Sequence, residues 1–239
     1  MSKKQSGAKF AKAPGLHEGK VKALFSTSDA FVSMCQIVRE DETIGFMTPT
    51  YTQRKLLDAY HNNNWVIVNK FRQAKITTIS VMLLLRDCMY LEGVKGLLIA
   101  ERQDTAEDIF ERILFAYQRL PDDVRMPLAP GKKAGATQMQ FVHGGGIKVL
   151  TAGGRSPAIG RSIDRLVITE FGEAQWQKKA AINITSKCGD QPWKVPVGFT
   201  HYSWSGGKTI VASHWIKASL PQAPSETTKS SIPECRCAT

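Results

Sequence analysis

Short apolar runs alternate with longer helical patterns along much of this 239-residue chain. Each run has about five residues, which suits a strand and is too short for a helix. The runs cover residues 65–69, 96–100, 166–170 and 209–213, and helical patterns occupy residues 51–61, 77–90 and 104–120. Apolar strands separated by helices predict an α/β fold with a mostly parallel central sheet flanked by helices.

The rest of the chain divides into one large domain and two flanking segments. Residues 1–25 are rich in Lys and carry no apolar period, which predicts a flexible basic arm. Residues 26–215 form the predicted domain, which opens with apolar residues at roughly helical spacing over residues 26–48. Residues 216–239 are rich in Pro, Ser and Thr and are expected to be disordered.

Two glycine-rich stretches have distinct predicted structures. Gly144, Gly145 and Gly146 separate apolar patterns at residues 138–142 and 147–152, which predicts a hairpin. Ser205-Gly206-Gly207-Lys208-Thr209 resembles a phosphate loop in its letters, but no apolar strand precedes it and no helix follows it. We therefore expect a turn that leads into the strand at residues 209–213.

The formal net charge is +11, from 32 Lys and Arg against 21 Asp and Glu. Such an excess indicates a polyanionic partner such as nucleic acid or a nucleotide. No run of 18 apolar residues and no signal peptide is present, so we expect a soluble, intracellular protein with no membrane partner. The five cysteines and five histidines have no zinc-ligand spacing, and we expect free thiols and no zinc site.

The strand at residues 65–69 is followed by a basic loop and then a helix. In this arrangement backbone N–H groups and the positive end of the helix can face an anion. Lys70, Arg72 or Lys75 is suited to bind phosphate oxygens, and the Thr77 hydroxyl is suited to bind Mg²⁺. The stretch does not match the common Gly-x-x-x-x-Gly-Lys-[Ser/Thr] pattern. The alternative is a basic surface loop with Thr77 as the N-cap of the helix.

The strand at residues 166–170 ends in the carboxylate of Glu170. An acid at the carboxyl end of a buried strand is suited to polarise a water molecule beside Mg²⁺. The alternative is an ordinary strand end, because three aliphatic residues followed by an acid also occur by chance.

Read together, these segments resemble the ATPase domain of the large terminase subunit of tailed phages, which has a P-loop NTPase-like fold. Lys70-Phe71-Arg72-Gln73-Ala74-Lys75-Ile76-Thr77-Thr78 matches a variant phosphate loop of the form Lys-x-Arg-Gln-x-Gly-x-Thr-Thr. The resemblance implies that residues 70 and 72–78 contact ATP. It implies Lys70 as the phosphate lysine, Arg72, Gln73, Ala74, Lys75, Ile76 and Thr78 as further loop residues, and Thr77 as the Mg²⁺ ligand.

Other motifs of this family have counterparts in the chain. Tyr51-Thr52-Gln53 resembles the aromatic-x-Gln that contacts adenine, although Gln53 also fits a capping box with Thr50. Glu170 resembles the catalytic Glu after the Walker B strand, and Thr169 stands at the second metal position, where an Asp is usual. Arg161 lies in a stretch resembling the loop that carries a transition-state arginine, a role for which Arg72 is the other candidate. Residues 209–213 resemble the strand that leads to the coupling motif.

The chain also departs from this family. Lys75 replaces the Gly of the variant loop, and either takes a positive φ itself or points its side chain outward. His214 stands where a small hydroxyl residue is expected. After Glu173 only three acidic residues remain, Asp190, Glu226 and Glu234, too few for the two-metal nuclease domain that follows in large terminases.

The resemblance implies an ATPase that uses Mg²⁺ and couples hydrolysis to translocation of double-stranded DNA into a procapsid. Its implied partners are double-stranded DNA, a terminase small subunit, a portal protein and further copies of itself in a ring, in the host cytoplasm. Two alternatives stay open. One is a catalytically inactive nucleotide- or DNA-binding fragment of a truncated terminase, and the other is a basic nucleic-acid module that binds no nucleotide.

Overall fold

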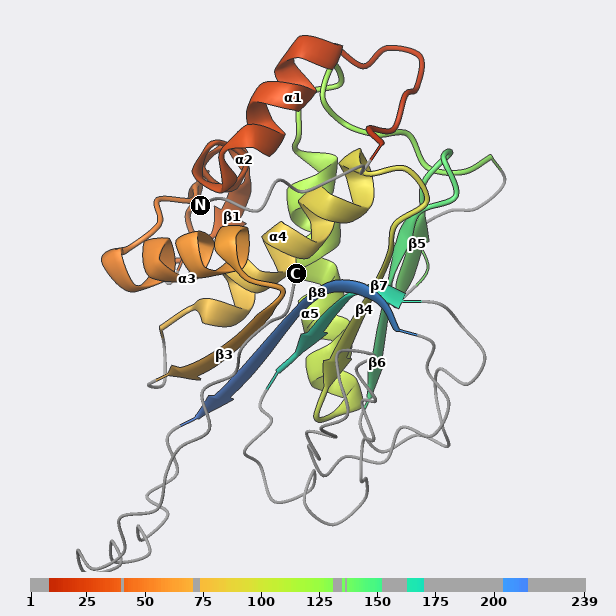
Figure 1. The fold of residues 1–239 in the computed structure, drawn as a ribbon. Helices are drawn as coiled ribbons and strands as arrows, with labels where there is room; N and C mark the ends of the chain where they lie inside the picture. The colour runs from red at the N-terminus through yellow and green to blue at the C-terminus, as the bar shows by residue number, and fades with distance from the viewer. Residues whose placement is uncertain are drawn as a thin grey trace, which may run out of the picture.

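The computed structural model describes residues 9–39, 41–70, 74–130, 135, 137–151, 163–169 and 204–214. Of Trp65, Asn69, Lys70 and residues 204–214 only the backbone is described. A six-stranded sheet in the order β3-β8-β7-β4-β6-β5 forms the centre of the molecule (Figure 1). The strands are β3 (Trp65–Lys70), β4 (Lys95–Ala100), β5 (Gln138–Gln140), β6 (Gly146–Thr151), β7 (Ile163–Ile168) and β8 (Trp204–His214).

Five neighbouring strands, from β3 to β6, run parallel, and only β5 runs antiparallel, against β6. The predicted α/β fold with a mostly parallel sheet is therefore confirmed, as is the hairpin around Gly144, whose φ of 84° suits glycine. The prediction for the second glycine-rich stretch was wrong. Residues 205–209 belong to β8 itself rather than to a turn before it, so this glycine-rich stretch lies in a strand.

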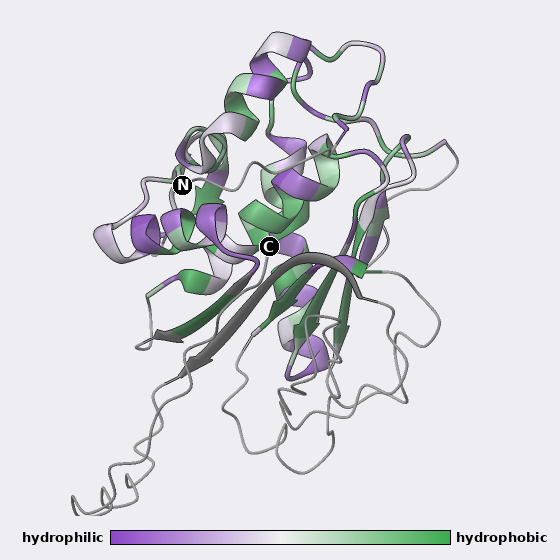
Figure 2. Cartoon of the chain, in the orientation of Figure 1, coloured by the Kyte–Doolittle hydropathy of each residue, from purple (hydrophilic) through white to green (hydrophobic). Residues whose placement is uncertain are grey.

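Three helices cover one face of this sheet: α3 (Tyr51–Asn62), α4 (Ile76–Tyr90) and α5 (Gln103–Gln118) (Figure 1). Their bounds agree with the predicted helices within two residues. The helix α4 is the centre of the core: it contacts both neighbouring helices and the strands β4, β6, β7 and β8, and it is apolar almost all round (Figure 2). Among the described helices, none is long and apolar enough to cross a membrane.

The N-terminal residues pack on the core instead of forming the basic arm predicted for residues 1–25. From Glu18 to Ser26 the chain forms helix α1, whose Val21 and Leu24 are buried. Ahead of it, Ala11 is buried, and its N–H donates to the Tyr90 carbonyl oxygen over 3.0 Å. The many lysines of this segment suggested an exposed arm. A few well-spaced apolar residues among them are buried, and their burial stabilises the fold. Residues 1–8 lie outside the described residues.

Helix α2 (Ser28–Met34) is shorter than the helical spacing over residues 26–48 suggested. A small antiparallel pair follows it, with β1 (Gln36–Val38) and β2 (Ile44–Phe46). The turn between these strands is fixed by Asp41, which accepts hydrogen bonds from the Thr43 N–H and hydroxyl over 3.1 and 2.6 Å. An Asp that bonds the backbone two residues on favours a turn over a continued helix.

Candidate functional site

The carboxyl ends of the parallel strands meet at one edge of the sheet, where ligands of α/β proteins bind. Lys70 at the end of β3 pairs with His214 of β8, and Ile168 at the end of β7 pairs with Val211 of β8 and with Ile99 of β4. The two strand ends that the sequence marked therefore lie at the same edge, with β8 between them. At about 4.8 Å per strand, their separation across the sheet is about 10 Å.

Helix α4 begins at this edge, inside the predicted phosphate-loop motif of residues 70–78. Its first residue is Ile76, its N-cap is Lys75, and the N-cap side chain makes no capping hydrogen bond. Thr77 is thus the second residue of the helix and is half-buried, so the alternative that made Thr77 the N-cap is wrong. The free N–H groups of a first helical turn carry partial positive charge, which favours an anion such as phosphate.

Lys75 occupies the left-handed region, with φ 52° and ψ 28°, and its side chain is exposed. Lys75 therefore both takes a positive φ and points its side chain outward, the two alternatives that the sequence left open. The backbone follows the path that glycine takes most readily, so the lysine does not prevent this loop conformation. A non-glycine residue there costs about 1 kcal/mol.

We expect Lys75→Gly to raise the free energy of unfolding by about 1 kcal/mol, because glycine adopts a positive φ without a Cβ clash. Urea-induced unfolding measures this change. Lys75→Ala is the matched control, since it removes the same side chain and its contacts but keeps the Cβ. A gain for alanine equal to that for glycine would show that the side chain, not the backbone conformation, is the cause.

Gln53 is buried at the start of α3 and closes the capping box that the sequence predicted. Its Oε1 accepts from the Thr50 N–H over 2.9 Å, and its own N–H donates to the Thr50 hydroxyl over 3.5 Å. The carboxamide nitrogen also donates to the carbonyl oxygens of Ala74 and Lys75, over 3.1 and 3.5 Å. Gln53 therefore ties α3 to the two residues that precede α4, and its role toward adenine stays a prediction.

Thr169 follows β7 directly and is buried. Its N–H donates to the Ile99 carbonyl oxygen over 3.0 Å, and its hydroxyl donates to the same oxygen over 3.4 Å. The residue expected at the second metal position thus bonds the neighbouring strand. Its predicted part in metal binding stays a prediction. Arg72, Gln73, Arg161 and Glu170 lie outside the described residues, and their predicted roles stay predictions as well.

Glu101 was missed by the sequence reading, although the signal for it was present. It follows the apolar run of β4 in the same way that Glu170 follows the run of β7. Its side chain is only 13% exposed and lies 3.9 Å from the guanidinium of Arg102, which is 62% exposed. The carboxyl edge therefore holds an acidic side chain, largely shielded from water, one strand away from β7.

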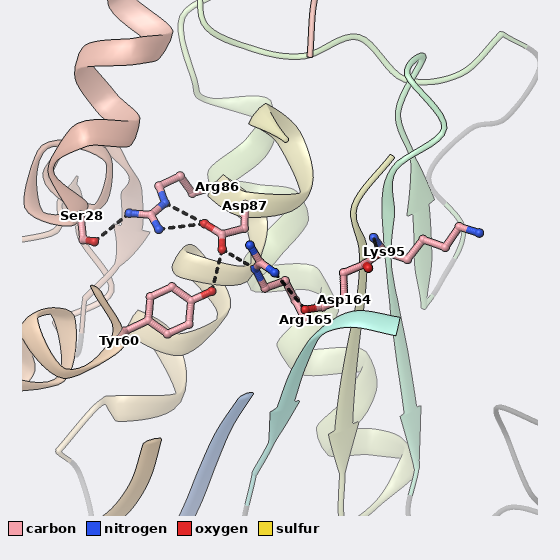
Figure 3. A network of polar contacts seen from close by, with 7 residues as sticks. All are labelled: Ser28, Tyr60, Arg86, Asp87, Lys95, Asp164 and Arg165. Carbon is pink, nitrogen blue, oxygen red and sulfur yellow. Dashed lines mark hydrogen bonds and ion pairs between the residues drawn. The ribbon is translucent and has the colours of Figure 1, made fainter. Parts of the chain in front are cut away.

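A buried charge network at the other end of α4 was also missed (Figure 3). Asp87 accepts hydrogen bonds from Arg86 over 2.8 and 3.0 Å, from the Tyr60 hydroxyl over 2.7 Å and from Arg165 over 2.6 Å. Arg86 also donates to the Ser28 hydroxyl over 2.7 Å. This network joins α2, α3, α4 and the start of β7, and it lies away from the edge that carries Lys70.

The charges of this network hold one another in the ionised state. Burial alone would raise the pKa of Asp87, but the positive charges of Arg86 and Arg165 outweigh burial and lower it to about 2. Burial and the adjacent Asp87 charge raise the pKa of the Tyr60 hydroxyl well above its usual range. An ionised carboxylate and a neutral phenol that donates to it are the result, as expected of a structural network.

The donor set at the carboxyl edge fits a nucleotide with Mg²⁺ better than an all-protein metal site. In the described part of the chain, no three His, Cys, Asp or Glu side chains converge as metal ligands. Mg²⁺ commonly takes only one or two protein oxygens and completes its shell with water and phosphate oxygens. The half-buried Thr77 hydroxyl in the first turn of α4 suits this mode of binding.

Comparisons with known proteins show what the fold is similar to. No protein-family model matches the sequence, and no curated protein matches it. The crystal structure of the HK97 bacteriophage large terminase matches over 79% of this chain, with a TM-score of 0.54 and 15% identity. The chain spans 37% of that terminase. The large terminase ATPase domain of Thermus phage P74-26 covers 70% of the chain at 15% identity, with a TM-score of 0.34. The HK97 likeness shows the fold: a P-loop NTPase-like α/β domain.

Proposed function

We propose that this chain is the ATP-hydrolysing motor domain of a viral DNA-packaging terminase large subunit. The observation that carries the proposal is the convergence of two segments at one sheet edge. The end of β3, the start of α4 and the end of β7 lie there together, within a fold like that of the HK97 large terminase. These segments carry the motifs for binding phosphate and for activating water.

In this proposal each residue at the edge has a distinct task. Lys70 and the first turn of α4 bind the phosphate oxygens of ATP, and the Thr77 hydroxyl binds the metal. Mg²⁺, when bound, neutralises charge on the β- and γ-phosphates. Glu170 accepts a hydrogen bond from the attacking water and orients it in line with the leaving group. Arg72 or Arg161 stabilises the charge that develops on the transferred phosphoryl group.

Hydrolysis is proposed to drive movement along double-stranded DNA. The net charge of +11 supports binding of DNA through its phosphates, without reading the bases. Acidic and basic residues are nearly balanced among the side chains that the structure describes, so most of the excess charge belongs to the other segments. We further propose that the chain works in the host cytoplasm as part of a ring of copies, with a terminase small subunit and a portal protein.

A catalytically inactive nucleotide-binding fragment is the second candidate, and the side chain of Lys75, at the position where the variant loop has glycine, favours it. A strained lysine at the N-cap places a long, charged side chain beside the first turn of α4, where phosphate is proposed to bind. ATP turnover in the presence of Mg²⁺ and DNA separates the two candidates. Turnover supports the motor, whereas tight binding without turnover supports the inactive fragment.

Titration calorimetry with Mg²⁺-ATP tests the binding that both candidates require. We expect the wild type to bind in the micromolar range, and Lys70→Ala to bind about 10- to 100-fold more weakly, because it loses a charged hydrogen bond to phosphate. Lys95→Ala is the matched control, since Lys95 begins β4 at the opposite ends of the strands (Figure 3). Its affinity for Mg²⁺-ATP should equal that of the wild type. Absence of binding by folded wild type would overturn the proposed function.

A further inference from the structure

The strands β4 and β7 stay paired up to their carboxyl ends. Ile99 is level with Ile168 in the register, and the Thr169 N–H continues the ladder to the Ile99 carbonyl oxygen over 3.0 Å. The next residues along the two strands are Ala100 and Thr169, and after Ala100 comes Glu101. Glu101 therefore follows β4 directly, and β4 lies one strand spacing, about 4.8 Å, from β7.

The Glu101 carboxylate is poorly compensated within the described part of the chain. Its side chain is 13% exposed, and the cation that faces it there, Arg102, is 3.9 Å away with a side chain that is 62% exposed. A long contact to a guanidinium in water offsets little of the cost of removing a carboxylate from water. Such an environment suits an acid that acquires a cation when a ligand binds.

The residue predicted at the second metal position, by contrast, carries no negative charge. Thr169 is buried, and its hydroxyl donates to the Ile99 carbonyl oxygen over 3.4 Å. A hydroxyl engaged in this way contributes no charge toward a cation. Glu101, one residue beyond the position of β4 that is level with Thr169, brings a negative charge to this edge.

We propose that Glu101, directly after β4, supplies the negative charge that Thr169 lacks, and that this charge helps to hold the hydrated Mg²⁺ of the bound nucleotide. This inference rests on the proposed ATP site. Glu101 acts through a metal-bound water, because Mg²⁺ keeps several of its waters when phosphates and one or two protein oxygens bind it. Water bridges of this kind span about the distance between neighbouring strands. Glu101 is thus a positioning residue for the cation.

Binding of Mn²⁺, a paramagnetic substitute for Mg²⁺, tests this role without relying on hydrolysis. The loss of the free Mn²⁺ signal in electron paramagnetic resonance is measured as protein is added in the presence of ADP. We expect Glu101→Gln to weaken Mn²⁺ binding at least tenfold, as is typical for partners of metal-bound groups. Glu101→Asp keeps the charge and should recover part of the affinity.

The matched control is Glu107→Gln on the exposed face of α5, where Glu107 accepts from Gln103 over 2.6 Å. Its Mn²⁺ affinity should equal that of the wild type. ADP affinity measured without metal should be the same for Glu101→Gln and the wild type, which shows that the nucleotide site is intact.

Two outcomes would contradict the proposal, and they can be told apart. If the wild type binds ADP and Mn²⁺, and Glu101→Gln binds both equally well, the role of Glu101 is overturned while the ATP site stands. If folded wild type binds neither, the proposed function fails and the role of Glu101 fails with it.

Discussion

Replacing Glu170 by glutamine is expected to lower the rate of ATP hydrolysis about 100- to 10,000-fold, the usual contribution of a general base. Glutamine keeps the size of the side chain but loses the negative charge that orients the attacking water. ATP binding should stay within about threefold of the wild type, because Lys70 and the first turn of α4 are unchanged. A large loss of turnover with little loss of affinity identifies a group that acts in the transition state.

Single-turnover hydrolysis with excess protein, in the presence of Mg²⁺ and DNA, measures the chemical step directly. Glu173→Gln is the matched control, because it removes the same charge three residues further along the chain. We expect its rate to be close to that of the wild type. Normal turnover in Glu170→Gln would exclude Glu170 as the water-orienting residue.

Asp87→Asn is expected to lower the free energy of unfolding by about 3–5 kcal/mol, the typical cost of breaking a buried ion pair from one side. The substitution leaves Arg86 and Arg165 facing each other in the core without the carboxylate that both contact. Urea-induced unfolding measures the change as a lower midpoint at an unchanged slope. Asp108→Asn on the exposed face of α5 is the control and should change stability by less than about 0.5 kcal/mol.

The Asp87 carboxylate also makes the free energy of unfolding depend on pH. The pKa of Asp87 is about 2 in the folded protein, below its ordinary value of 3.8, so the unfolded chain binds a proton more readily. The stabilisation is therefore complete above about pH 4 and is lost as the pH falls toward 2. The difference corresponds to about 2 kcal/mol. This part of the acid dependence should vanish in Asp87→Asn, and an unchanged acid profile would contradict the assignment.

The sequence predicted the central sheet well, because its strands are short, apolar and bounded by polar residues. The β3 run, residues 65–69, and the β4 run, residues 96–100, were found within one residue of their bounds. Thr50 and Gln53 fixed the start of α3 in the same way, since a capping box involves only residues three apart. Signals of this kind are local, so a single sequence contains them.

The features that the sequence did not predict depend on contacts between distant segments. Arg165 meets Asp87 across 78 positions, and no local pattern marks two charges in an apolar helix as a buried pair. Burial of Val21 and Leu24 depends on the surface that α4 offers, while the lysines around them suggested a free arm. Glu101 has a local signal, an acid directly after an apolar run, but its place beside the strand of Thr169 depends on the register of β4 against β7.

The position of β8 has a consequence for the order in which the domain is completed. It is the last described strand along the chain, yet it lies between β3 and β7 and pairs with both. A chain emerging from the ribosome makes every other described strand first, and until β8 inserts, the sheet lacks the strand that joins β3 to the rest. The strand ends carrying Lys70 and Thr169 reach their native spacing only at that step. Nucleotide binding would therefore report that assembly of the sheet has finished.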